Sequence, residues 1–164
     1  MSERMAPDLT RFVAAQDDGG TLAAALAELR AGRKRSHWMW FVFPQLRGLG
    51  RSQTAQLYGI DGREQARDYL HDAVLGPRLR ECARALLDLP GDDPVAVLGG
   101  VDAQKLRSSM TLFAHAADTD ADTTDTADAD ADDRALFVAV LDRYFHGVED
   151  EATVRLLAAG GSAS

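Results

Sequence analysis

The residues best suited to chemistry lie in one short stretch, SHWMWFVFPQL, which runs from Ser36 to Leu46. It holds four of the chain's eleven aromatic residues within six positions, and the basic run 33–35 (Arg-Lys-Arg) comes directly before it. Indole rings stack on flat ligands, guanidinium groups bind phosphate through paired hydrogen bonds, and ammonium groups add a point charge. The stretch therefore indicates either a buried aromatic segment with charged neighbours or the wall of a site for a flat or anionic ligand.

Charge is divided between two segments of opposite sign. Residues 29–60 contain six basic side chains and no acid, whereas residues 118–133, DTDADTTDTADADADD, contain eight aspartates and no base. The other 18 acids balance the 18 bases, so the formal charge of −8 comes from this one insertion. The separation of charge into blocks says more about partners than the total does.

The aspartate segment resembles a calcium loop only at its start, where Asp118, Asp120 and Asp122 alternate. Its sixth position is Thr123 where such a loop needs glycine, and its twelfth is Ala129 where the loop needs a bidentate glutamate. Because the segment has little apolar content, the sequence predicts a solvated, mobile surface loop over residues 117–133. No metal site and no cofactor are predicted.

Length and composition indicate one domain that buries its own core. The chain has 164 residues, of which 46% are hydrophobic and 27% charged, as in ordinary globular proteins. Cys82 is the only cysteine, which excludes an internal disulfide and favours a cytoplasmic location. The N-terminus lacks a signal-peptide pattern, and no apolar run approaches the length of a membrane span. Motifs of the GxSxG, GxGxxG, HExxH and Walker types are also absent.

Helical spacing of apolar residues, bounded by capping residues, recurs along the chain and predicts an all-α, compact, single-domain fold. The expected core covers residues 8–158, with flexible tails at 1–6 and 159–164. The stretch 38–43 is expected to be a buried, extended aromatic connector. The expected helices lie at 8–18, 21–31, 52–58, 61–71, 77–89, 93–98, 102–113, 135–145 and 150–157.

Five motifs appear in the order found in domain-of-unknown-function family 1810, which the chain resembles over about residues 9–157. They are SHWMWFVFPQLRGLGRS, LYGI, DYLHDAVLGPRLRE, DAQKLRSSMTLF and YFHGVEDEATVRLL. The resemblance implies a bacterial or fungal protein with an all-α fold, and it implies no activity. The label "calpastatin", sometimes given to this family, does not fit, because calpastatin is disordered and this chain has capped amphipathic helices.

The family motifs contain positions whose side chains suit phosphate and a stacked ring, through hydroxyl, cationic, polar and aromatic groups. They are His37, Trp38, Trp40, Gln45, Arg51, Ser52, Tyr58, Lys105, Ser108 and Thr111. Asp102 and Glu64 are candidates for a catalytic carboxylate. The alternative interpretation places the aromatic residues in the core, with their polar atoms bonded to the backbone.

Three functional hypotheses follow. The first is a site for a small anionic nucleotide-like or ADP-ribose-like ligand, with hydrolysis, for instance N-glycosidic cleavage, as its enzymatic form. The second is a non-enzymatic module that binds single-stranded nucleic acid through residues 29–60, although the charge of −8 counts against it. The third is a protein-interaction domain in which the same basic segment meets a partner's acids.

Overall fold

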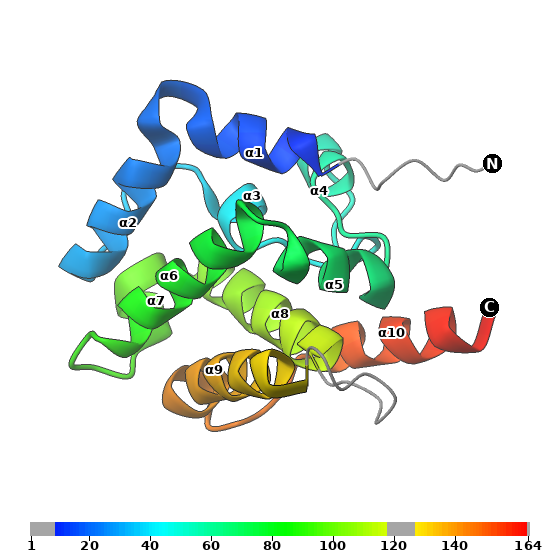
Figure 1. Ribbon diagram of the computed structural model, residues 1–164. Coiled ribbons are helices and arrows are strands. Elements are labelled where there is room, and N and C mark those ends of the chain that lie inside the picture. The colour runs from blue at the N-terminus through cyan, green and yellow to red at the C-terminus, as the bar shows by residue number, and fades with distance from the viewer. Residues whose placement is uncertain (1–8, 118–126, 164) are drawn as a thin grey trace.

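The computed structural model describes residues 9–117 and 127–163, and within these ranges the regular structure is helical (Figure 1). Its elements are α1 (Thr10–Asp17), η1 (Asp18–Gly20), α2 (Thr21–Ala31), α3 (Met39–Val42), α4 (Gln53–Leu57), α5 (Arg63–His71), α6 (Leu75–Leu87), α7 (Pro94–Leu98), α8 (Gly100–Ala117), α9 (Ala127–Phe145) and α10 (Glu151–Ala163). An isolated parallel bridge joins Leu46 to Ile60. The predicted all-α fold is confirmed.

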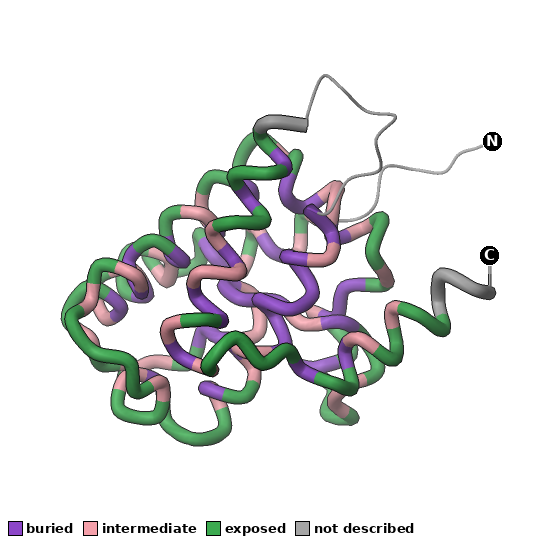
Figure 2. The backbone as a smooth tube through the Cα atoms, turned by 90° about the horizontal axis from the view of Figure 1, so that it is seen from below, coloured by how far each residue is buried: buried purple, intermediate pink, exposed green. Residues whose placement is uncertain are grey.

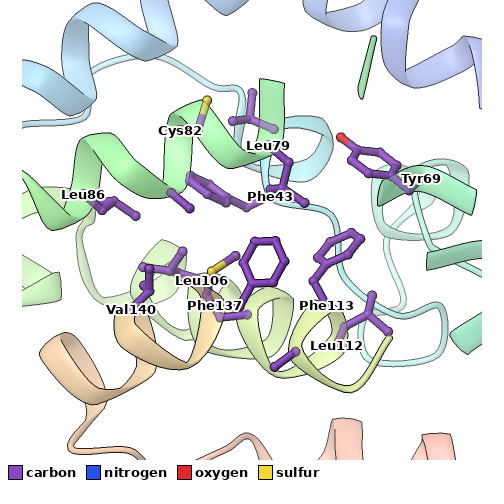
Figure 3. Packing of buried hydrophobic residues seen from close by; sticks show 14 of the residues in the cluster. Phe43, Tyr69, Leu79, Cys82, Leu86, Leu106, Leu112, Phe113, Phe137 and Val140 are labelled. Carbon is purple, nitrogen blue, oxygen red and sulfur yellow. The ribbon is translucent and has the colours of Figure 1, made fainter. Parts of the chain in front are cut away.

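Helix α8 is the centre of the fold, and α5, α7, α9 and α10 all pack against it. Every residue from Ser108 to Ala114 is buried, as expected for a helix that is enclosed on all sides. Figure 3 shows Leu79 of α6 facing Phe113 of α8 and Phe137 of α9, with Phe43 among them. Figure 2 shows that buried segments run through the middle of the molecule and exposed segments around its outside.

Within the stretch 38–43 four residues are buried, as predicted, whereas Trp40 and Phe41 are half-buried. The prediction of an extended connector is wrong. Met39–Val42 form the short helix α3, with the Val42 amide bonded to the Trp38 carbonyl at 3.1 Å. A single helical turn satisfies these backbone groups locally, which an unpaired extended segment in the core could not do. Trp38 and Phe43, at its two ends, are both fully buried.

Capping residues predicted some helix ends well and others poorly. Ser52 accepts the Ala55 amide at 3.0 Å and begins α4; Asp93 accepts two amides at the start of α7. Gly32 ends α2 in the left-handed conformation, at φ 77°, where glycine is favoured. The helix predicted from residue 61 begins at Arg63, because Gly62 holds the N-cap position without a side-chain bond and the Asp61 carboxylate pairs with Arg47.

Only the two ends of the predicted aspartate loop, residue 117 and residues 127–133, are described, and both are helical. Residues 118–126 lie outside the described residues, whereas residues 127–133 form the first turns of α9. Asp130 and Asp133 are buried there, on the stripe that continues into Phe137 and Val140. The prediction of a solvated loop is wrong for residues 127–133, because ion pairs with α5 and α6 replace the apolar contacts that the sequence lacks.

Helix α10 continues to Ala163, beyond the predicted helix end at residue 157. It extends away from the bundle at the end opposite α2, as Figure 1 shows. The predicted tail 1–6 lies outside the described residues. Among the helices described, none is long and apolar enough to cross a membrane.

Candidate functional site

The most unusual arrangement of charged side chains surrounds Asp102. Its Oδ2 lies 2.8 Å from Lys34 Nζ and its Oδ1 lies 3.1 Å from Lys105 Nζ. Each ammonium also lies over an indole ring, Lys34 at 5.0 Å from the centroid of Trp38 and Lys105 at 4.1 Å from that of Trp40. These are the only two lysines and the only two tryptophans of the whole chain. We call the five residues the lysine–tryptophan cluster.

Three segments bring the cluster together. Asp102 and Lys105 share one face of the first turns of α8, because residues three apart on a helix are neighbours. Lys34 follows α2, and its backbone amide donates to the Val97 carbonyl of α7 at 2.7 Å. Trp38 and Trp40 flank the start of α3. The loop before α4 borders the second ring, since a Cβ on Gly50 would lie 3.8 Å from the outer edge of Trp40.

Solvent reaches only part of the cluster. The Lys34 side chain is 8% exposed and Trp38 is 0% exposed, so both belong to the interior. The side chains of Asp102 and Lys105 are each 18% exposed, and Trp40 is half-buried. A ligand could therefore contact Lys105, Asp102 and the rim of Trp40, but not the face of Trp38.

Asp102 of the cluster and Glu28, which accepts the indole N–H of Trp38, are both ionised at neutral pH. Burial disfavours the charge of Asp102, but hydrogen bonds from Lys34 and Lys105 outweigh it and hold its pKa below the ordinary value. Glu28 on α2 is also partly desolvated, yet bonds from Ser36, Arg35 and Trp38 lower its pKa to about 2. Neither group is suited to donate a proton.

Several predicted site residues do not join this cluster. The Ser108 hydroxyl is buried and donates to the Gln104 carbonyl at 3.2 Å. Thr111 is 0% exposed, donates to the Arg107 carbonyl and accepts the Asp150 amide. Their hydroxyls are therefore used inside the fold and do not reach a ligand.

The other predicted residues are exposed or half-buried, and no contact joins their side chains to the cluster among the described residues. Ser52 caps α4, and Glu64 is exposed on the first turn of α5. Tyr58 packs on Phe41, with ring centroids 5.3 Å apart. His37 and Arg51 are exposed, and Gln45 is half-buried, its carbonyl accepting the Ile60 amide.

Tyr58 also lines an open surface hollow of about 610 Å³ between α1, η1 and α4. Its other walls are Arg11, Ala14, Ala15, Asp17 and Asp18. Arg11 uses its guanidinium to donate to the carbonyls of Leu57 and Gly59. The hollow thus shares Tyr58 alone with the predicted site.

Half of the basic residues in segment 29–60 are paired within the fold. Arg30 pairs with Glu81 on α6 at 2.8 Å, Arg47 with Asp61, and Lys34 with Asp102. Arg33, Arg35 and Arg51 are exposed, and among the described residues no side-chain partner of theirs is found. These three arginines keep their charge available to an anion.

Cys82 is buried on α6, and burial raises the pKa of its thiol to about 12. A thiol in that state is a poor nucleophile. Among the described residues, no three His, Cys, Asp or Glu side chains gather as metal ligands.

Sequence reasoning missed two residues that shape the cluster. In the sequence, Lys34 belongs to the basic run 33–35, and Glu28 lies within the helix predicted over residues 21–31. A signal for Lys34 was present: the chain has sixteen arginines and two lysines, so each lysine position is worth a separate explanation. No sequence pattern marked Glu28.

Comparison with known proteins places the chain in a family. Residues 6–157 match the family described as "Protein of unknown function (DUF1810)", and the chain belongs to that family. It is similar to the conserved hypothetical protein Rv1873 from Mycobacterium tuberculosis, whose crystal structure is solved at 1.38 Å. The two share 48% sequence identity with a TM-score of 0.80, over 92% of this chain and 96% of that one. No curated protein matches the sequence.

Proposed function

We propose that this protein binds a small phosphate-bearing ligand, nucleotide-like or ADP-ribose-like, at the solvent side of the lysine–tryptophan cluster. The observation that supports it most is the convergence of both lysines on Asp102, each over one of the two tryptophans. At Asp102 the two ammonium groups and the carboxylate sum to +1 in a partly desolvated place, and the ionised Glu28 contacts the cluster only at the Trp38 indole N–H. Such a place attracts an anion more strongly than open surface does.

Each reachable residue has a role in this proposal. Lys105 shares Asp102 with Lys34, so its ammonium keeps donors for a phosphate oxygen. Asp102 has lone pairs for the hydroxyl groups of a sugar. Arg51 follows Gly50 at the rim of Trp40, where its exposed guanidinium would add a two-pronged phosphate contact.

Binding is better supported than hydrolysis. A carboxylate that activates water acts as a base, and the pKa of Asp102, held below its ordinary value by the two lysines, makes it a weak one. Glu64, the other candidate, is exposed on α5 and makes no contact that joins it to the cluster in the described residues. We therefore propose a binding role and assign no catalytic residue.

The test is calorimetric titration of inorganic phosphate, pyrophosphate, AMP, ADP and ADP-ribose. Replacing Lys105 with methionine keeps the apolar stem and removes the charge. Because a hydrogen bond to a charged group contributes about 1.5–3 kcal/mol, we expect Lys105→Met to weaken binding of the best ligand by about ten- to a hundredfold.

Arg134→Gln is the matched control, since Arg134 is an exposed base on α9 and its loss changes the net charge equally. Unchanged affinity in this control would show that the effect is local. Failure of the wild-type protein to bind any member of the panel at millimolar concentration would refute the proposal.

A second candidate, binding of single-stranded nucleic acid, is favoured by one observation. Arg33, Arg35 and Arg51 are exposed in a segment that contains no acid. Stacking is less well supported, because Trp38 is fully buried and Lys105 already lies over the ring of Trp40. Ionic strength separates this candidate from the first.

A further inference from the structure

The side chain of Glu28 organises residues 33–38, which we call the lysine loop. Its Oε1 accepts the amides of Arg35 at 2.7 Å and Ser36 at 3.0 Å, together with the indole N–H of Trp38 at 2.9 Å. Its Oε2 accepts the Ser36 hydroxyl at 2.5 Å. One carboxylate on α2 thus binds four donors of a single loop, and bonds of this charge-assisted kind are the strong ones.

The position of Lys34 depends on this loop. Its backbone is bonded to Val97, and its ammonium donates to the Ser36 carbonyl as well as contacting Asp102. The amide and hydroxyl of Ser36 are in turn held by Glu28. A continuous series of hydrogen bonds and one ion pair therefore joins Glu28 to Asp102 through Ser36 and Lys34.

Lys34 also decides what Lys105 can offer to an anion. With Lys34 in place, Asp102 divides its charge between two ammonium groups. If Lys34 moved away, the carboxylate would neutralise Lys105 alone, and the local charge of the group would fall from +1 to zero. A residue that fixes Lys34 thereby fixes the charge at the surface of the cluster.

We infer that Glu28 is a positioning residue: by folding the lysine loop it holds Lys34 against Asp102 and keeps the Lys105 ammonium available to an anionic ligand. The ligand part of this inference rests on the proposed function. Glu28 itself reaches no ligand, because its carboxylate oxygens are used by the loop. Its effect would be transmitted through Lys34.

The experiment uses Glu28→Gln, which keeps the shape of the side chain and removes its charge, with pyrophosphate as the probe in calorimetry. We expect Glu28→Gln and Lys34→Met each to weaken pyrophosphate binding about tenfold, the size of one charge-assisted contact. Because both act through one path, the double variant should bind no more weakly than the weaker single variant.

Glu81→Gln is the control, since Glu81 also pairs with a residue of α2, Arg30, but at an exposed site away from the lysine loop. Circular dichroism confirms that each variant is folded at the titration temperature. A merely structural role for Glu28 predicts additive losses in the double variant, so additive losses, or unchanged affinity in Glu28→Gln, would overturn the inference.

A second readout does not need a ligand. Lys34 and Lys105 are the chain's only lysines, so acetic anhydride labelling followed by peptide mass spectrometry measures each side chain separately. Lys34, 8% exposed in the wild type, should be acetylated several-fold faster in Glu28→Gln and not in Glu81→Gln. If the wild type bound no pyrophosphate, the proposed function would fail, and an unchanged rate at Lys34 would separately refute positioning by Glu28.

Discussion

The chain has far more arginines than lysines, and the two residue types make different kinds of contact in the structure. The sixteen arginines include long-range ties such as Arg143 to the Leu89 carbonyl and Arg80 to Asp133. The two lysines instead share one aspartate. An ammonium is a compact point charge with three donors, and Lys34 uses it to contact both Asp102 and the Ser36 carbonyl.

The ionisation of Glu28 should be visible in the acid stability of the protein. Its pKa of about 2 in the folded state lies below the ordinary 4.5, so its stabilising effect is complete above pH 4.5 and is lost as pH falls toward 2. We therefore expect wild type to be more stable than Glu28→Gln at pH 7, with a smaller difference at pH 3.

Urea unfolding at the two pH values measures this difference, with Glu81→Gln as the control. Glu81 is exposed, so its substitution should have a small effect at either pH. An equal destabilisation by Glu28→Gln at pH 7 and pH 3 would contradict the charge-assisted account of its hydrogen bonds.

At the scale of elements, the start of α9 shows a helix held by charge where apolar residues are missing. Arg80 of α6 binds Asp133 through two bonds of 2.7 and 2.9 Å. Arg67 of α5 binds Asp130 and also the last turn of α8, at Ala116. His71 adds a contact to Asp130 at 3.4 Å. These ties place α9 against α5 and α6 and continue the stripe formed by Phe137 and Val140.

Substitution of Asp133 should lower the unfolding free energy, whereas substitution of its neighbour Asp132 should leave it nearly unchanged. The Asp133 side chain is 6% exposed, so Asp133→Asn leaves Arg80 partly buried without its charge partner. We expect a loss of about 2 kcal/mol of unfolding free energy, with faster hydrogen exchange in the first turns of α9.

Asp132→Asn is the matched substitution, because Asp132 is exposed on the same turn and its change of charge is identical. We expect it to alter stability by less than about 0.5 kcal/mol. Similar losses in the two variants would mean that total charge in the aspartate segment, and not the pair with Arg80, governs the stability of α9.

At the scale of the whole molecule, opposite charges are kept in separate regions. The chain carries −8 overall, yet Arg33, Arg35 and Arg51 are exposed in a segment without an acid. Net repulsion acts at long range and is screened by salt, whereas a phosphate in contact with Lys105 would feel the local charge. The sign of the total charge is therefore a poor guide to the ligand.

Ionic strength should separate a small ligand from a nucleic acid. If three arginines contact three phosphates of a single strand, the logarithm of affinity should fall against the logarithm of salt with a slope of about −2. We expect a 12-nucleotide strand to follow such a slope between 50 and 200 mM salt (about the range over which the effect is large), and pyrophosphate to respond less.

Fluorescence anisotropy of a labelled strand and calorimetry with pyrophosphate give the two slopes. The variant Arg33→Gln/Arg35→Gln should bind the strand more weakly and bind pyrophosphate with unchanged affinity. A strand that binds more tightly than pyrophosphate at the higher salt would reverse our preference between the two candidate functions.

The linear order of residues is enough to predict the helical class, most element positions and several helix ends. The apolar stripes, the caps at Ser52 and Asp93 and the stop at Gly32 depend on residues a few positions apart, and such local relations can be read from a linear pattern. The family motifs also belong to this level.

Which charged groups meet depends on how the helices pack in three dimensions. Segments far apart in the chain meet where Lys34 pairs with Asp102 and where the buried Asp130 pairs with Arg67. Trp38 is buried by the same packing. The partners of these charged groups are set by how α2, α5, α8 and α9 pack, and a charge pattern along the sequence does not specify which distant opposite charge will be nearest. For that reason no sequence pattern assigns Glu28 or Lys34 to the cluster, and two aspartates expected in solvent lie in the interior.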